Sequence, residues 1–353
     1  MTSLFTPIQL GAIAAPNRLL MAPMTRARGT REHTPTPMMA TYYAQRASAG
    51  LIISEAIGIS QEGLGWPFAT GIWNREQIDG WRKVTDAVHT AGGRMIAQLW
   101  HMGRVVHPSM GGQLPVSASA TMAPGHAHTY AGAMPHVQAR PLRTDEMPEI
   151  LAQYARAARH AMQAGFDGVQ IHASNGYLID QFLRDSDNHR TDAYGGSIAN
   201  RIRLLREVSE AVAEEIGADR VGVRLSPNGE TQGTRDSDPL ALFASALEML
   251  SSLGIAHLEL REPPLDGSFG VGYLPPLAPQ LRPYFKGPLI LNSDFGIARA
   301  QADLDAAVGD AVSFGRPYIA NPDFPNRVAR GLPLKADDRD TWFTQGAAGY
   351  IDY

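Results

Sequence analysis

Short apolar segments of β-type residues recur along the chain at wide, fairly regular intervals. They are residues 18–21, 51–53, 95–97, 168–171, 221–225, 256–260, 289–291 and 311–314. Between most of them, apolar residues repeat with the period of a helix, and helix-start signals precede the repeat. The clearest helical stretches are 76–91, 145–164, 197–216, 238–253 and 296–308. This alternation is typical of a parallel sheet built from strand–helix units.

Eight such units are the number that closes into a barrel, so the sequence predicts an α/β protein with the (β/α)8 TIM-barrel fold. A doubly wound sheet is the rival architecture. It is disfavoured because no G-x-G-x-x-G turn follows the first strand and no G-x-x-x-x-G-K-[ST] motif occurs. Because the chain shows no internal repeat or linker, we expect residues 1–353 to form a single domain.

Two long insertions interrupt the pattern. Residues 101–143 follow the third predicted strand, and residues 261–283 follow the sixth. In a barrel, such loops lie at the C-terminal face, where active sites are built. Each insertion is expected to be either a loosely packed surface excursion or a lid over the site.

Composition and charge narrow the class of protein. Of the 353 residues, 44% are hydrophobic, which excludes a disordered chain. The absence of cysteine excludes disulfides, thiolate zinc sites, iron–sulfur clusters and cysteine nucleophiles. A formal net charge of −4 argues against a nucleic acid or an acidic membrane as partner. Since the sequence has no membrane-length apolar run and no signal-peptide pattern, we expect a cytoplasmic protein.

The end of the fourth predicted strand carries the most informative side chains, His172, Asn175 and Tyr177. A neutral imidazole N–H and an amide N–H can both point at one carbonyl oxygen and stabilise the charge that develops there. A phenol, with a reference pKa of about 10, keeps its proton at neutral pH and can give it to a carbanion-like carbon. A histidine–asparagine pair can equally anchor a loop, so the other strand ends must decide.

Those strand ends favour a cofactor with one anionic and one imide-like end. Gly315 and Arg316 end the eighth strand, where barrels often bind a phosphate, although Arg316 alone would also fit a surface ion pair. A buried Arg224 on the fifth strand needs an anionic partner. Gln98 on the third strand offers an amide donor and acceptor together. Phosphate at one end and an imide-like ring at the other describe FMN.

Longer motifs run almost from end to end of the chain. They are NRLLMAPMTR at 17–26, AQLWHMGR at 97–104, PVSASA at 115–120, GFDGVQIHASNGYL at 165–178, RTDAYGGS at 190–197, GRP at 315–317 and NPD at 321–323. On these motifs the chain resembles the old yellow enzyme family of FMN-dependent ene-reductases. Thr25, where the thermophilic-like subgroup has cysteine, separates the chain from that subgroup. The lack of cysteine also separates it from larger relatives that carry an iron–sulfur cluster.

The resemblance implies a flavin site and a substrate site, residue by residue. The expected FMN contacts are Pro23, Met24, Thr25, Ala56, Gln98, Arg224, Ser293, Asp294, Gly315 and Arg316. The expected substrate-binding residues are Trp100, His172, Asn175, Tyr177, Trp342 and Phe343. At Asp294 the backbone N–H is expected to bind while the carboxylate points away. Phe269 is a further candidate for the pocket.

The resemblance also implies a reaction. NADPH or NADH docks transiently and reduces a tightly bound, non-covalent FMN, and an activated alkene carrying a carbonyl or nitro group then accepts the hydride at its β-carbon. His172 and Asn175 bind the substrate carbonyl, and Tyr177 protonates the α-carbon. The expected partners are therefore small molecules, and the protein is expected to be a monomer or homodimer.

Five histidines, His101, His107, His126, His128 and His136, crowd the first insertion. Metal sites usually combine histidine with regularly spaced thiolate or carboxylate ligands. Here the spacing is irregular and no carboxylate cluster lies nearby, so we expect no metal.

Three other functions are alternatives, and the sequence argues against each. A barrel glycosidase needs paired carboxylates, for which Glu55 and Glu259 are available, although the fourth strand ends in a histidine rather than an acid. A Schiff-base aldolase needs a lysine at a strand end. Lys83, Lys286 and Lys335 lie instead in a helix, before the seventh strand and in the C-terminal tail. The third alternative is a protein that binds a flavin without catalysing a reaction. Only the intact set of His172, Asn175 and Tyr177 argues against it.

Overall fold

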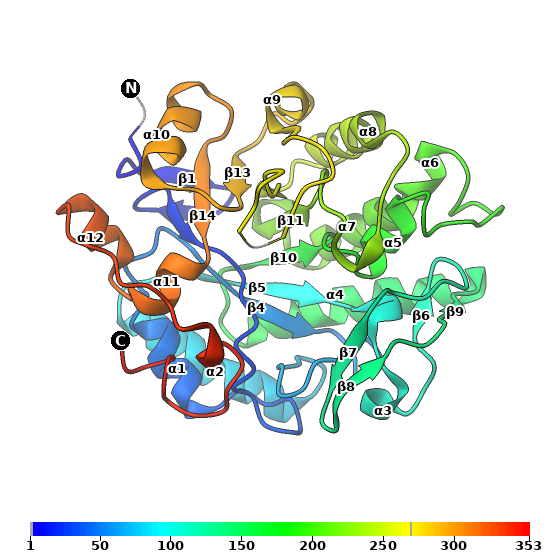
Figure 1. Cartoon of the computed structure of the whole chain (residues 1–353), viewed down its shortest axis with the longest axis horizontal. Helices are drawn as coiled ribbons and strands as arrows, with labels where there is room; N and C mark the ends of the chain where they lie inside the picture. Colours follow the sequence, from blue (N-terminus) through cyan, green and yellow to red (C-terminus); the bar gives the residue numbers. More distant parts are fainter. Residues whose placement is uncertain (1–2, 269) are drawn as a thin grey trace.

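The computed structural model describes residues 3–268 and 270–353, and its centre is a closed parallel barrel (Figure 1). The barrel strands are β3 (Leu19–Met21), β4 (Ile52–Gly58), β5 (Met95–Trp100), β10 (Gly168–His172), β11 (Val221–Leu225), β12 (His257–Arg261), β13 (Leu289–Asn292) and β14 (Ala311–Phe314). Each predicted strand corresponds to one of them, and β5 pairs with β10 in the ring. The predicted (β/α)8 fold is confirmed.

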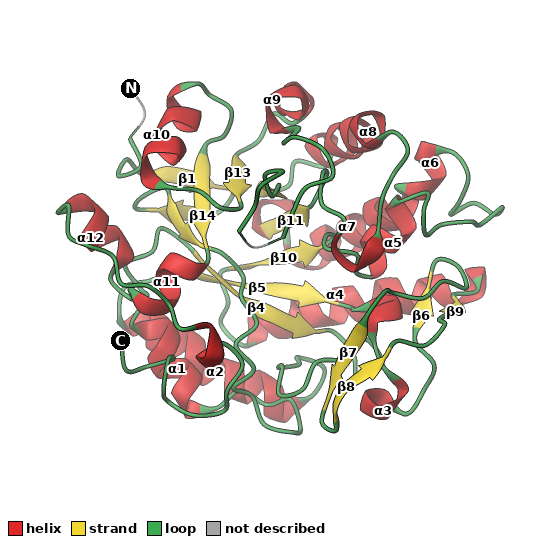
Figure 2. Ribbon diagram, viewed as in Figure 1, coloured by secondary structure: helices red, strands yellow, loops and turns green. Residues whose placement is uncertain are grey.

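Helices surround the strands, as Figure 2 shows. They are α1 (Pro37–Ala44), α2 (Arg75–Thr90), α4 (Met147–Gln163), α5 (Leu178–Leu183), α6 (Ile198–Arg201), α7 (Arg203–Ile216), α8 (Pro239–Ser252), α9 (Ala278–Leu281), α10 (Ile297–Asp305), α11 (Arg316–Ala320) and α12 (Phe324–Ala329). The amphipathic pattern predicts the long ones well. The predicted helix over 197–216 is divided at Ile202 into α6 and α7, and α7 buries the apolar face that the pattern indicates.

One end of the barrel is closed by a small hairpin that the sequence pattern does not predict. Its strands, β1 (Ile8–Leu10) and β2 (Ile13–Ala15), pair antiparallel. Leu10, Ile13 and Ala15 pack in one apolar cluster with Leu20 and Ile53 of the barrel strands. The site must therefore open at the other end.

The two insertions lie where the sequence predicts, after β5 and after β12. The first contains α3 (Pro108–Gly111), β6 (Val116–Ser117), the hairpin β7 (His126–Thr129) and β8 (Gly132–Pro135), and β9 (Arg140–Pro141). The second runs from β12 to α9 without a helix or strand among its described residues. Within the ranges 3–268 and 270–353, no helix is both long and apolar enough to cross a membrane.

Candidate active site

A cavity of about 590 Å³ opens at the C-terminal ends of the barrel strands. This size falls in the range usual for ligand and cofactor pockets. Its lining includes most of the predicted site: Pro23, Met24, Thr25, Trp100, Asn175, Tyr177, Arg224, Ser293, Asp294, Gly315, Arg316, Trp342 and Phe343. The other predicted residues, Ala56, Gln98 and His172, are buried. The structure therefore brings together side chains from positions 23 to 343.

The three polar residues after β10 form one group with an aromatic neighbour. The ring of Tyr177 stands edge-on to the rings of His172 and Trp100, with centroids 5.0 Å away in each case. The rings of Trp100 and His172 lie nearly parallel, 6.4 Å apart. Asn175 lines the cavity, and its Oδ1 is buried without a hydrogen-bond partner in the described chain. The side-chain NH2 group of Asn175 donates to none of the described residues either, so the amide can still both accept from and donate to a ligand.

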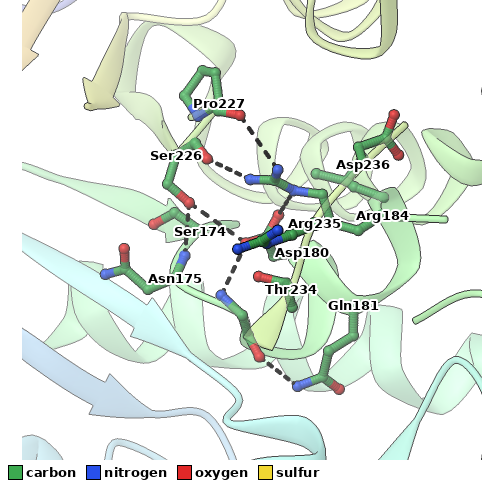
Figure 3. Close-up of polar contacts among 12 residues, drawn as sticks. Ser174, Asn175, Asp180, Gln181, Arg184, Ser226, Pro227, Thr234, Arg235 and Asp236 are labelled. Atoms are coloured by element: carbon green, nitrogen blue, oxygen red, sulfur yellow. Dashed lines mark hydrogen bonds and ion pairs between the residues drawn. The ribbon is translucent and has the colours of Figure 1, made fainter. Parts of the chain in front are cut away.

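A tight turn aims these side chains, and Figure 3 shows what holds it. Asn175 and Gly176 both have left-handed backbones, with φ of 59° and 74°. The N–H of Asn175 donates to Ser226 Oγ at 2.9 Å, and the N–H of Gly176 donates to Asp180 Oδ2 at 2.9 Å. Asp180 in turn pairs with Arg184 at 2.8 Å, with both side chains fully buried. The turn is thus held by hydrogen bonds to Ser226 and to Asp180, and Asp180 is itself held by a buried ion pair.

The electrostatics of the group suit the predicted roles. Burial, reinforced by Arg224 and Arg261, lowers the pKa of His172 well below its usual value, so the imidazole is neutral. Ser174 Oγ lies 3.0 Å from Nδ1, and a hydroxyl donating there places the ring hydrogen on Nε2. Burial raises the pKa of Tyr177 to about 12, although Arg261 and Arg224 act in the opposite direction. The phenol therefore keeps its proton.

The residues expected at the pyrimidine end of a flavin come from the neighbouring strands β4 and β5 and from β11, one strand further around the barrel. Ala56 of β4 is in register with Gln98 of β5. Arg224 of β11 lines the cavity, where its Nη2 donates to Asn292 Oδ1 at 2.7 Å and its Nε lies 3.2 Å from a carboxylate oxygen of Glu259. This end thus presents one guanidinium and one amide.

The residues expected at a phosphate end meet between β13 and α11. Ser293 and Asp294 have left-handed φ values of 118° and 47°, a conformation that is costly outside glycine and is found at ligand clamps. Helix α10 begins after Gly296, which has no side chain to cap it. Arg316 is the first residue of α11 and lines the cavity. Strained backbone at Ser293 and Asp294 and a guanidinium, all lining one corner of the cavity, are compatible with an anion site.

The expectation for the Asp294 side chain is wrong. Its carboxylate does not point away but forms an ion pair with Arg316. It also accepts hydrogen bonds from Ser268, 2.6 Å from the N–H and 2.9 Å from the hydroxyl. The acid is turned inward because a nearby guanidinium and two donors of the second insertion satisfy it together.

The C-terminal segment, residues 337–349, supplies Trp342 and Phe343 to the cavity. Two arginines that closely follow Thr25 hold it. Arg26 donates to the main-chain oxygens of Trp342 and Gly349, at 3.1 and 2.8 Å. Arg28 donates to the main-chain oxygen of Trp342 at 2.7 Å and to other oxygens of the segment.

Several lining residues are missing from the sequence prediction: Trp66, Thr231, Arg261, Asn292, Ser313 and Asp337. Arg261 and Asn292 are the last residues of β12 and β13, so a search for polar residues at the C-terminal strand ends could have found them. Trp66 and Asp337 lie in loops without any pattern. The first insertion contributes no lining residue in the described chain; it packs His128 against Trp66 instead, at 4.3 Å. Phe269 lies outside the described residues.

Comparison with known proteins gives the family. The model of the NADH:flavin oxidoreductase / NADH oxidase family matches residues 3–335. The old yellow enzyme homologue from Zymomonas mobilis is 58% identical, with a TM-score of 0.99, 100% of this chain and 99% of that chain covered. The chain belongs to the old yellow enzyme family. Morphinone reductase in complex with tetrahydroNAD is 44% identical, with a TM-score of 0.94 and 100% and 97% of the two chains covered. The 12-oxophytodienoate reductase 1 of Oryza sativa subsp. japonica is 39% identical, with 99% and 92% covered.

Membership makes this old yellow enzyme an oxidoreductase and implies FMN and a nicotinamide nucleotide. The cavity fits FMN in its donor chemistry. Arg224 lines it near the buried Gln98, and Arg316 lines it together with Ser293 and Asp294. The glycosidase alternative does not fit. Neither Glu55 nor Glu259 belongs to the cavity lining, and both carboxylates are fully buried.

Proposed function

We propose that this old yellow enzyme is an NAD(P)H-dependent ene-reductase that reduces the C=C bond of α,β-unsaturated carbonyl or nitro compounds. The observation that carries the proposal is the group after β10. Asn175 with unused hydrogen-bonding capacity and a protonated Tyr177 line the cavity, and a neutral His172 lies buried beside them, its ring centroid 5.0 Å from that of Tyr177. The Nε2–H of His172 and the NH2 group of Asn175 are donors that suit the oxygen of an enone, and the Tyr177 hydroxyl suits its α-carbon.

In this function His172 and Asn175 bind the carbonyl oxygen. The Nε2–H of His172 and the amide of Asn175 stabilise the negative charge that develops on that oxygen. Tyr177 then gives its phenolic proton to the α-carbon, and the phenolate takes a proton back from solvent. The nearby guanidinium groups of Arg224 and Arg261 favour that transient phenolate, because they oppose the effect of burial on the Tyr177 pKa.

FMN, held non-covalently by the predicted contacts, would supply the hydride for the β-carbon. Arg224 and Gln98 would hold the pyrimidine ring, Thr25 the edge of the ring system, and Arg316 with the Ser293–Asp294 backbone the phosphate. Arg316 already forms an ion pair with Asp294, and both residues line that corner of the cavity. A bound phosphate would therefore have to share the Arg316 guanidinium with the Asp294 carboxylate.

The substrate side of the cavity is aromatic. The rings of Trp66 and Phe343 are tilted by 55° with centroids 5.3 Å apart, and Trp100 lies beside Tyr177. Such walls suit a flat conjugated alkene stacked over a ring. The nicotinamide donor, NADPH or NADH, would use the same place in alternation with the alkene. This supports a small-molecule substrate of planar, conjugated type.

The first test is cofactor binding. Purified protein should be yellow, or should take up FMN and quench its fluorescence when the apoprotein is titrated. A colourless protein that cannot be reconstituted with FMN would contradict the proposal.

The second test separates the two half-reactions. Tyr177→Phe should leave the reduction of bound flavin by NADPH unchanged within about twofold. It should slow the reoxidation by 2-cyclohexen-1-one by about 100- to 10,000-fold, the usual loss for a general acid. Stopped-flow absorbance of the flavin measures both rates. Tyr154→Phe is the matched control, because the Tyr154 hydroxyl is also buried but lies on α4 away from the cavity. Equal losses in both half-reactions would remove Tyr177 from the proton-donor role.

A further inference from the structure

A chain of buried polar side chains runs across the barrel interior below the cavity. Gln98 Nε2 donates to Gln170 Oε1 at 2.8 Å, and Gln170 Nε2 donates to Glu259 Oε2 at 2.8 Å. The three residues belong to β5, β10 and β12, and none is more than 1% exposed. None of the roles described above uses Gln170 or Glu259.

The carboxylate of Glu259 fixes the donor-to-acceptor direction of these hydrogen bonds. A carboxylate only accepts hydrogen bonds, so Gln170 must turn its NH2 group toward Glu259 and its carbonyl toward Gln98. Gln98 must then offer its own NH2 group to that carbonyl. This fixes Oε1 of Gln98 as an acceptor; the hydrogen bonds of Gln98 with the described residues run through its Nε2 and its main-chain N–H, not through this oxygen.

The same carboxylate also faces the cation of the cavity. Glu259 Oε2 lies 3.2 Å from Nε of Arg224, and Ser313 Oγ donates to Glu259 Oε1 at 2.5 Å. Asn292 donates to Ser313 through Nδ2 at 3.0 Å and accepts from Arg224 at 2.7 Å. Because a buried guanidinium needs a charged partner, Glu259 compensates part of the positive charge that Arg224 presents to the cavity.

We propose that Glu259 is a positioning residue for the flavin ring and sets how strongly the site favours reduced over oxidised FMN. This rests on the proposed function. Through Gln170 it holds the Gln98 amide with its oxygen toward the imide N–H of the ring. Through Arg224 it moderates the cation beside the part of the ring where negative charge gathers on reduction.

The two actions give different signatures. Removing the charge of Glu259 leaves Arg224 uncompensated, which strengthens the binding of the anionic reduced flavin more than that of the oxidised flavin. Removing the hydrogen bonds of Gln170 leaves the charge of Glu259 in place and loosens only the Gln98 amide. Oxidised and reduced FMN should then both bind more weakly, and the ratio of their affinities should be unchanged.

The experiment measures FMN affinity and reduction potential in four variants. Apoprotein is titrated with FMN by fluorescence, and the potential is taken from equilibration with a reference dye at pH 7. Glu259→Gln should raise the ratio of reduced to oxidised affinity about tenfold, which makes the two-electron potential about 30 mV more positive. Gln170→Met should weaken the binding of oxidised FMN several-fold with the potential unchanged. Glu259→Met repeats the loss of charge without an unpaired amide, so the test does not depend on the folding of one variant.

Glu262→Gln is the matched control. Glu262 is also buried and follows the same strand, but it accepts from the main chain of Leu277 and Ala278, at 2.7 and 3.0 Å, rather than facing Arg224. It should leave the potential unchanged. A wild-type potential in both Glu259 variants, or an equal shift in Glu262→Gln, would overturn the inference while FMN binding stands. Failure of the wild-type apoprotein to bind FMN would instead overturn the proposed function.

Discussion

The wall of the cavity formed by residues 172–177 and the wall formed by residues 337–349 are both held by buried arginines, but the arginines have different partners. Behind the first wall, Arg184 pairs with the carboxylate of Asp180, and both side chains are fully buried. Behind the second, Arg26 and Arg28 bind mainly main-chain oxygens of the segment. One wall rests on an ion pair and the other on carbonyl groups.

This difference predicts different mechanical behaviour. Water cannot replace a buried carboxylate, so the first wall should stay rigid as long as the protein is folded. The carbonyl partners of Arg26 and Arg28 are neutral groups, and residues 343–348 beside them are exposed, Phe343 by 46%, so water can reach these carbonyls after a small local opening. The second wall should therefore open locally at a lower free energy than global unfolding. On the proposed function, the rigid wall would carry the chemistry and the adjustable wall would contact the variable part of a substrate.

The largest effect is expected from breaking the ion pair of the rigid wall. Asp180→Ala leaves Arg184 buried without its carboxylate and removes the acceptor for Gly176. We expect the free energy of unfolding in urea to fall by about 3–5 kcal/mol, the usual cost of an uncompensated buried charge. Alkene reduction should be lost with it, because the turn at Asn175 is no longer fixed.

The control for this prediction is an exposed ion pair. Arg159 and Glu215 form a two-pronged pair at 2.6 Å on the surface. Glu215→Ala should cost less than about 1 kcal/mol. If the two substitutions cost the same, the first wall does not depend on a buried ion pair.

A second prediction concerns the support of the adjustable wall and its dependence on pH. Glu55 is fully buried below this wall, and burial raises its pKa to about 7, although a hydrogen bond from Tyr43 and the charges of Arg26 and Arg28 act against the shift. The folded state therefore binds this proton more tightly than the unfolded chain. Its stabilising contribution is complete below about pH 4.5 and is lost as the pH rises through about 7, by at most about 3 kcal/mol.

Urea unfolding at pH 5 and pH 8 measures this contribution. Glu55→Gln should remove that part of the fall in stability, whereas Glu149→Gln, at an exposed helix position, should leave the fall unchanged. An unaltered pH dependence in Glu55→Gln would place the proton uptake on another group.

The barrel could be predicted from the sequence because its signals are local. Buried strands read as apolar runs and covering helices as amphipathic repeats, so all eight strands and the long helices are confirmed. The hairpin β1–β2 escaped because strands of three residues carry no readable period. The ends of the strands also carried the candidate polar residues, since parallel strands all end at one face.

The second wall could not be predicted in this way. Arg26 and Arg28 bind oxygens of the main chain more than 300 residues away, and a carbonyl group leaves no mark in the sequence. The inward carboxylate of Asp294 depends in the same manner on Arg316, 22 positions later. Contacts of this kind are set by tertiary packing and not by spacing.

The smallest effect is expected from loosening the adjustable wall itself. Arg28→Met removes donors to Trp342, Thr341 and Thr344 while keeping most of the apolar side chain. The freed carbonyls can be hydrated, so the loss should appear in substrate binding more than in global stability. Losing the packing of one aromatic ring is worth about 0.5–1.5 kcal/mol, or roughly a 2- to 10-fold rise in KM. This rise should occur for an enone carrying a phenyl group and not for 2-cyclohexen-1-one. The value of kcat should be unchanged for both, since the wall would bind the substrate and the transition state equally well.

Arg31→Met is the matched control, because Arg31 lies in the same loop but packs over Tyr130, 4.6 Å from its centroid. If KM rises equally for both substrates, or kcat falls for the small one, the second wall takes part in positioning the reacting atoms and the contrast between the two walls does not hold.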